Sequence, residues 1–261
     1  MKKLAIIALS FALLVPSALS CGGGSTGGRP VALRTALAAD AEIERPIETE
    51  TGWTVRVDEA RLSLGALYYF DGEPAFVLRP ASSPLQRLAA LFRAGVARAH
   101  PGHYIAGTAL GQMTAPYAGT LGTEPVALAE GTGLTGLYRS ARLVLSDREA
   151  SDVATIKGSA SKGEKTVYFE LSASLEDATR SVKNGEVNGC LFDEVEVEDD
   201  GTVTVTVLPH VWLDLVEFDE LAPGSAEQPT KVAQGETAQV AFALGVVQLS
   251  AYRFSYQANG K

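Results

Sequence analysis

The chain has 261 residues and a formal net charge of −9, because 31 Asp and Glu side chains face 22 Lys and Arg side chains. This acidic balance argues against nucleic acid and against an anionic lipid surface as partners, since both carry negative charge. The length allows one large domain with a substantial core, or two small domains.

The amino terminus has the pattern of a signal peptide. Lys2 and Lys3 form a short basic region, and an apolar run follows over residues 4–15. A run of about 12 residues is too short to span a bilayer, which needs about 20. It is typical of a signal-peptide core that is followed by small residues and a cleavage site. We therefore expect residues 1–20 to be removed.

The stretch Ala18-Leu19-Ser20-Cys21 resembles the bacterial lipobox, in which cleavage occurs before a diacylated cysteine. The resemblance implies a lipoprotein with a palmitate-type anchor at Cys21, and two or three acyl chains hold a protein stably on a membrane. Gly22 stands where an Asp would retain an enterobacterial lipoprotein at the inner membrane, so the outer membrane is favoured. Ala18 replaces the usual Leu or Val, and ordinary secretion with cleavage at a nearby small residue is the alternative.

The residues after Cys21 predict a tether. The segment Gly-Gly-Gly-Ser-Thr-Gly-Gly-Arg-Pro cannot bury apolar surface, so residues 21–49 are expected to form a flexible linker and residues 50–261 a β-rich globular domain. Loss of Lys2 and Lys3 would make the net charge −11. With Cys21 lipidated, Cys190 is the only thiol left, so the domain must rely on core burial or bound ligands rather than on a disulfide.

Period-two alternation dominates the rest of the chain and predicts strands. Val alternates with Thr over residues 202–207, which is the pattern of a half-buried strand. The Asp-Asp-Gly at residues 199–201 predicts a hairpin turn between two strands. The expected strands cover residues 53–57, 61–70, 75–78, 141–145, 166–171, 190–197, 202–208, 211–216 and 238–254.

One helix is expected over residues 84–96, capped by Ser83 and ended by Pro101-Gly102, because its apolar residues fall on one face. A weaker helix is expected over residues 175–182. Many strands with few helices indicate a mainly β protein, and the expected fold is an antiparallel β-sandwich with one packed helix.

The histidines carry the main functional hypothesis. His100 and His103 bracket Pro101-Gly102, the type II turn pair that brings the outer Cα atoms within about 7 Å. His210 lies at a boundary between two expected strands, so all three imidazoles could meet at one pole of a sandwich. Three neutral imidazoles and a fourth donor suit copper or zinc. The candidates for that fourth donor are Met113, Asp214 and Cys190.

Two alternatives stay open. The His-Pro-Gly-His turn can simply cap the end of a helix, where imidazolium is favourable. His210 can be an incidental loop or core residue, and the protein is then a structural or recognition β-sandwich on the membrane. The acidic residues 193–200 are interpreted as a solvated strand face, because no calcium-loop pattern is present.

No enzyme motif has its required context. Residues 131–136 match Gly-x-Gly-x-x-Gly, but no clear helix follows and no βαβ unit is indicated. Residues 159–162 match Ser-x-x-Lys in a Gly-rich turn without the partner motifs. We therefore expect the protein not to be an enzyme.

Residues 52–55 and 60–69, with Phe192-Asp193 and residues 212–216, resemble segments of MbnP-like periplasmic copper-associated proteins. The resemblance implies copper handling through histidine and tryptophan, which here would be His210 and Trp212.

Overall fold

The computed structural model describes residues 28–75 and 104–259 of the chain. The protein is mainly β, with 49% strand and 15% helix, and its strands form one large mixed sheet. The mainly β class predicted from the sequence is therefore confirmed. The expected helix over residues 84–96 lies outside the described residues.

The strands have the following bounds in chain order: β1 (Pro30–Ala39), β2 (Ile47–Glu48), β3 (Thr54–Phe70), β4 (Ala109–Met113), β5 (Tyr117–Thr120), β6 (Val126–Ala127), β7 (Gly131–Leu134), β8 (Gly136–Leu145), β9 (Ala154–Lys162), β10 (Lys165–Ala173), β11 (Glu186–Val197), β12 (Gly201–Val207), β13 (Thr230–Lys231) and β14 (Tyr252–Ala258). The helices are α2 (Leu175–Thr179), α3 (Pro209–Leu213) and α4 (Thr237–Val246), with short 3-10 turns η1 (Ala41–Glu44), η2 (Lys183–Gly185) and η3 (Leu249–Ala251).

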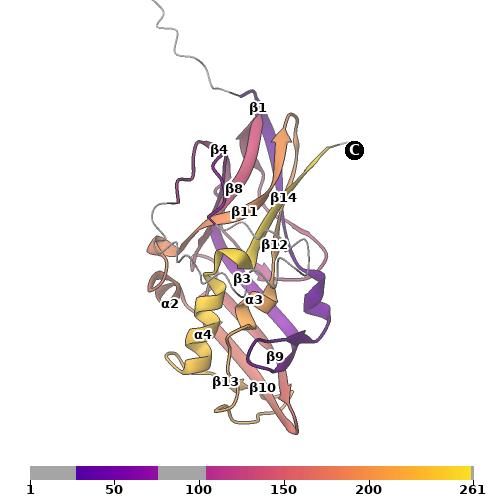
Figure 1. Ribbon diagram of the computed structural model, residues 1–261, viewed down its shortest axis with the longest axis vertical. Helices are drawn as coiled ribbons and strands as arrows, with labels where there is room; N and C mark the ends of the chain where they lie inside the picture. Colours follow the sequence, from indigo (N-terminus) through magenta and orange to yellow (C-terminus); the bar gives the residue numbers. More distant parts are fainter. Residues whose placement is uncertain (1–27, 76–103, 260–261) are drawn as a thin grey trace, which may run out of the picture.

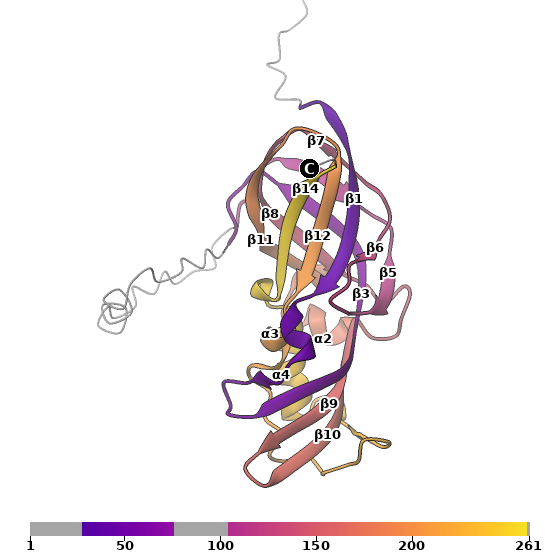
Figure 2. The same ribbon diagram turned by 90° about the vertical axis from the view of Figure 1, so that its right-hand side faces the viewer.

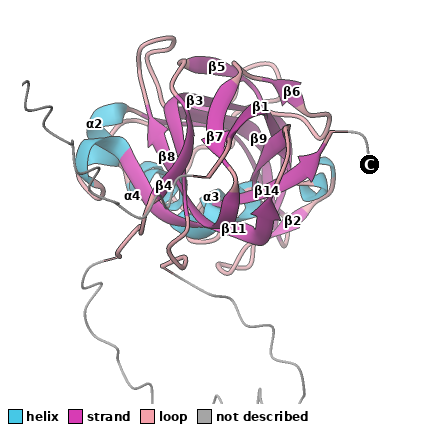
Figure 3. Cartoon of the chain, turned by 90° about the horizontal axis from the view of Figure 1, so that it is seen from above, coloured by secondary structure: helices cyan, strands magenta, loops and turns pink. Residues whose placement is uncertain are grey.

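Part of the sheet closes on itself. The strand order runs β3-β4-β7-β1-β12-β14-β11-β8, and β8 pairs back with β3. Seen from above, these strands surround a common interior (Figure 3). The long strand β3 also leaves this ring and pairs with β9, which pairs with β10, so that a second sheet region extends below the ring (Figures 1 and 2).

Aromatic side chains fill the ring. Tyr69 packs edge-on against Phe192 and Phe254, with ring centroids 5.8 and 6.2 Å apart. The ring centroids of Tyr138 and Phe192 lie 5.5 Å apart. The hydroxyl of Tyr138 donates to the carbonyl oxygens of Leu110 and Leu134. Each fully buried large apolar side chain contributes about 1.5–3 kcal/mol to folding. The ring interior is therefore a packed core.

The helices cover the lower sheet region, where α4 packs against β10 and α3 packs against α4 (Figure 1). Trp212 of α3 lies edge-on to Phe242 of α4, with ring centroids 5.9 Å apart. Gly245 allows this approach, because a Cβ there would lie 2.7 Å from the Cα and the carbonyl oxygen of Trp212. On the sheet side, Phe218 packs between Trp53 and Phe169.

The expected fold was an antiparallel β-sandwich with one packed helix. The sandwich is not confirmed, and the expectation of a purely antiparallel sheet is wrong because the sheet is mixed. β1 pairs with β12 in parallel, as do β11 with β14 and β10 with β13. The Asp-Asp-Gly turn at residues 199–201 does not close a hairpin either, since β14 from the end of the chain inserts between β11 and β12. A turn signal fixes the local backbone, but it does not determine which strand becomes the neighbour.

Three expected segments also differ. Residues 211–216 were expected as a strand, but α3 occupies Pro209–Leu213, with Pro209 in its first turn. Most of residues 238–254 forms α4, whose apolar residues occur on all sides and so give no helical period. Residues 30–39, expected in the tether, form β1 inside the sheet. The weaker helix expected over residues 175–182 is confirmed as α2, which ends earlier.

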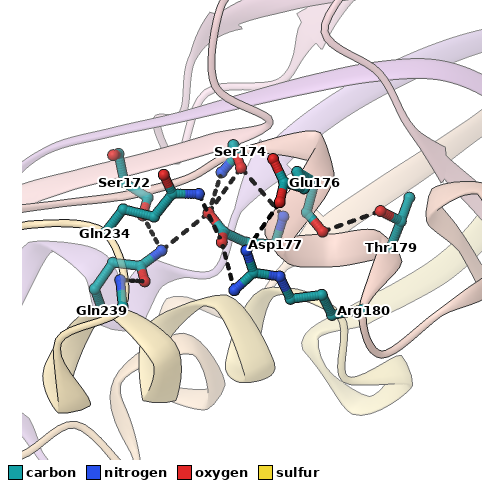
Figure 4. A network of polar contacts seen from close by, with 9 residues as sticks. Ser172, Ser174, Glu176, Asp177, Thr179, Arg180, Gln234 and Gln239 are labelled. Atoms are coloured by element: carbon teal, nitrogen blue, oxygen red, sulfur yellow. Dashed lines mark hydrogen bonds and ion pairs between the residues drawn. The ribbon is translucent and has the colours of Figure 1, made fainter.

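A buried carboxylate ties α2 and α4 to the sheet (Figure 4). Oδ2 of Asp177 accepts hydrogen bonds from the amide and hydroxyl of Ser174, at 3.1 and 2.7 Å, and from Nε2 of Gln239 at 3.1 Å. Oδ1 accepts from Nε2 of Gln234 at 3.2 Å. The amide of Gln239 also donates to the carbonyl oxygen of Ser172 in β10. Burial raises the pKa of Asp177, but these hydrogen bonds outweigh burial and lower it below its usual value.

We predict that Asp177→Asn lowers the free energy of unfolding at pH 7 by about 1–3 kcal/mol, because one of the two acceptor oxygens becomes an NH2 group that faces other donors. The folded-state pKa is depressed, so the contribution of Asp177 is complete above the unfolded value near 3.9 and is lost as pH falls through the folded value. Urea unfolding at pH 7 and at progressively lower pH measures the difference. The exposed Glu164→Gln is the control, and an equal effect of both substitutions would contradict the prediction.

Candidate functional site

His210 lies where two parallel strands end together. β1 and β12 run side by side to the pair Ala39 and Val207, after which the chain continues into η1 and α3 respectively. Figure 2 shows the η1 turn, drawn in indigo, beside α3. This arrangement places Nδ1 of His210 2.9 Å from Oε2 of Glu42. The imidazole is about one-third exposed, at 33%.

The side chains of His210 and Glu42 form a short polar contact. Its length suits a hydrogen bond, but Nδ1 has no partner with hydrogen-bond geometry and is buried against the carboxylate. Because Glu42 is exposed, a small rotation of its carboxylate would align the two groups. A carboxylate at Nδ1 fixes the ring and leaves Nε2 as the nitrogen available to a ligand.

Further carboxylates surround this imidazole. Asp214 follows His210 by one helical turn and is half-buried. Burial raises the pKa of Asp214, the charge of His210 lowers it, and the charges of Glu50 and Glu42 raise it further. A hollow of about 360 Å³ beside His210 is lined by Glu42, Arg45, Pro46, Ile47 and Glu48. The site is therefore open to small ligands and predominantly negative.

A larger hollow of about 550 Å³ lies on the outer face of β11, β14 and β12, close to the end of the sheet at which His210 lies. Leu191, Arg253 and Thr206 line it, and they occupy consecutive positions across the three strands. Arg253 forms an ion pair with Asp193 at 2.9 Å on its border. Asp40 and Leu208, which precede η1 and α3, complete the hollow on the side of His210.

Of Cys21 and the three histidines, only His210 is among the described residues. Cys21, His100 and His103 lie outside the described residues. The segment that contains the two histidines joins the described fold at Ala75 and Tyr104. The amide of Ala75 donates to the carbonyl oxygen of Gly189.

Tyr104 and Ser140 are joined by a hydroxyl–hydroxyl hydrogen bond of 2.6 Å. Both attachment points therefore lie on the β8–β11 part of the ring.

The other candidate ligands are core residues, with one exception. Met113 and Cys190 are buried in the hydrophobic core, and burial raises the pKa of the Cys190 thiol to about 12. A thiol held protonated in an apolar core is a poor metal ligand. Trp212 is fully buried against Phe242, on the inner side of α3. Asp214 alone remains beside His210.

Glu42 is the residue of the candidate site that sequence reasoning missed. It falls in the segment interpreted as tether, where no fixed contact was expected. The signal that could have found it is Asp40, whose carboxylate accepts from the amide of Glu42 and caps η1. An Asp two residues before an acidic residue is a local turn signal, but it does not predict a partner more than 160 residues away in the sequence.

Within residues 28–75 and 104–259, no three His, Cys, Asp or Glu side chains are arranged to hold a metal ion. Over the same residues, no helix is both long and apolar enough to cross a membrane. Comparison with protein-family models, curated proteins and solved structures finds no match.

Proposed function

We propose that the protein is a lipid-anchored protein of the cell envelope that binds copper or zinc through His210 together with His100 and His103. The observation that carries the proposal is the contact of Glu42 with Nδ1 of His210. Histidines that ligate metals commonly have a carboxylate or carbonyl at the second ring nitrogen, which fixes the ring and raises its basicity. The same contact leaves Nε2 for the metal.

The surrounding charges favour a cation. Glu42, Glu50 and Asp214 give the pole a negative potential, which raises the local concentration of divalent ions. Asp214 offers an oxygen donor one helical turn from His210. Imidazole ligands with one carboxylate suit Zn²⁺ and Cu²⁺ better than Ca²⁺ or Mg²⁺, which prefer sites built from oxygen alone.

A recognition function is the second candidate. It is favoured by the exposed apolar side chains Leu215, Val240 and Leu244 on the helical side of the molecule. In this case the protein is a non-catalytic binding module and its histidines are incidental.

We predict that the untagged chain from residue 22 onwards binds one Cu²⁺ or Zn²⁺ ion with a dissociation constant below the micromolar range. His100→Ala/His103→Ala should abolish this binding, and His210→Ala should weaken it by at least about tenfold, since each removes a ligand. Glu42→Gln should weaken it by about 10–100-fold, because the carboxylate in contact with Nδ1 of His210 is lost. Titration calorimetry and elemental analysis measure the affinity and the stoichiometry.

Glu44→Gln is the matched control for Glu42→Gln. It lies on the same turn, but its carboxylate accepts from the hydroxyl of Thr123 rather than contacting His210. Circular dichroism establishes that each variant is folded. A parent protein that binds neither ion more tightly than micromolar, or a His210→Ala variant with parental affinity, would refute the metal-binding proposal.

The lipid anchor gives a separate prediction. In a bacterial host, the full chain should incorporate labelled palmitate and fractionate with membranes, whereas Cys21→Ala should lose both properties. Cys190→Ser is the control, because it removes the other thiol and should keep the label. Label retained by Cys21→Ala, or absent from the parent, would contradict the anchor.

A further inference from the structure

Helix α4 is apolar on its outer side as well as its inner side. The helix Thr237–Val246 has no charged residue. Phe242, Ala243 and Val246 are buried against the sheet and α3. On the opposite side, Val240 and Leu244 are 41% and 40% exposed. A surface helix of a globular protein normally carries polar residues there, and within residues 28–75 and 104–259 nothing covers the outer side of α4.

The apolar surface continues from α4 onto the segment after α3. Leu215 is 58% exposed, and a hollow of about 190 Å³ that is lined by Val211, Leu215, Ala241 and Gly245 joins the two elements. Among the described residues, five large apolar side chains are exposed, and three of them gather here. We name Leu215, Val240, Ala241 and Leu244 the α4 patch. Clustering of this kind marks an interaction site, whereas single exposed apolar residues do not.

Acidic side chains flank the α4 patch. Glu50 and Asp214 line the hollow between α3 and α4. At the start of α4, a second hollow of about 560 Å³ is lined by acidic residues, namely Glu217, Asp219, Glu220 and Glu236. In the described parts of the chain, no Lys or Arg lines either hollow, but Asp219 already forms an ion pair with Lys162 at 3.5 Å. The rim carboxylates that form no ion pair within these parts are Glu217, Glu220 and Glu236.

We propose that the α4 patch binds a basic amphipathic helix of another polypeptide, whose apolar side chains pack on Val240, Leu244 and Leu215 and whose Lys or Arg side chains pair with the flanking carboxylates. Helix-in-groove recognition uses this combination of apolar anchors and a charged rim. An anionic membrane would be repelled by the flanking carboxylates, and a second copy of the chain would bring the same carboxylates into contact. Val240 and Leu244 take no part in the proposed metal site, whereas Glu50 and Asp214 border both sites.

The test uses the chain from residue 22 onwards, which keeps every described residue, and a synthetic 14-residue peptide as the probe. The peptide has Leu at helical spacing on one face and Lys on the other, and a matched peptide has Glu in place of Lys. Fluorescence anisotropy of labelled peptide should show saturable, salt-sensitive binding of the Lys peptide and no binding of the Glu peptide.

Substitutions locate the binding surface. Val240→Ser/Leu244→Ser should weaken binding of the Lys peptide by at least about tenfold, the effect expected when central apolar contacts are removed. Val126→Ser is the matched control, because Val126 is equally exposed, at 40%, on a different part of the molecule. It should bind as the parent does.

Three results would overturn the proposal. One is equal binding by the parent and Val240→Ser/Leu244→Ser, which would show that net charge alone attracts the peptide. The second is self-association in sedimentation that the double substitution abolishes, which would assign the α4 patch to a second copy. The third is binding to anionic phospholipid vesicles that is lost in the same variant.

Discussion

The pairing of β3 with two sets of partners is the constraint on which the rest of the structure depends. This strand has 17 residues, and its first part pairs with β2 and β9 while its second part pairs with β4 and β8. Register shifts between residues 57 and 59 and between 64 and 66 let it bend from one set to the other. The pairing with β8 closes the ring, and the pairing with β9 carries the lower sheet on which α4 packs. The two regions consequently share one continuous hydrophobic core.

Parallel pairing of β1 with β12 creates the environment of His210. Because the two strands run in the same direction, η1 and α3 leave the sheet at the same end, and Glu42 meets His210. In an antiparallel pair, the two following segments would leave at opposite ends. A histidine held by a carboxylate, with further carboxylates nearby, is chemically suited to a metal ion. Asp214 lies near His210 and also lines the hollow beside the α4 patch. One acidic region therefore lies between the proposed metal site and the proposed peptide site.

The sequence predicted those parts of the fold in which local patterns agree with tertiary packing. The Val–Thr alternation of residues 202–207 predicted a strand, and a helix was expected over residues 175–182; both elements occur, as β12 and α2. Alternation did not predict α4, because a helix that is apolar on all sides shows no periodic pattern. It did not predict β1 either, because the Ala-rich residues of this strand follow a Gly-rich segment and were interpreted as part of the tether. His210 was found as a candidate because its residue type is chemically distinctive. Glu42 was missed because its role arises from strand pairing over a long sequence distance, which one sequence does not reveal.

The central claim is that His210 ligates a transition metal through Nε2 while Nδ1 faces Glu42. Anomalous diffraction at the copper or zinc absorption edge, on crystals of the metal-loaded chain from residue 22 onwards, tests it most directly. The account predicts one strong anomalous peak about 2 Å from Nε2 of His210, with nitrogens of His100 and His103 at similar distances. No peak at His210, or a peak at another group of side chains, would contradict it.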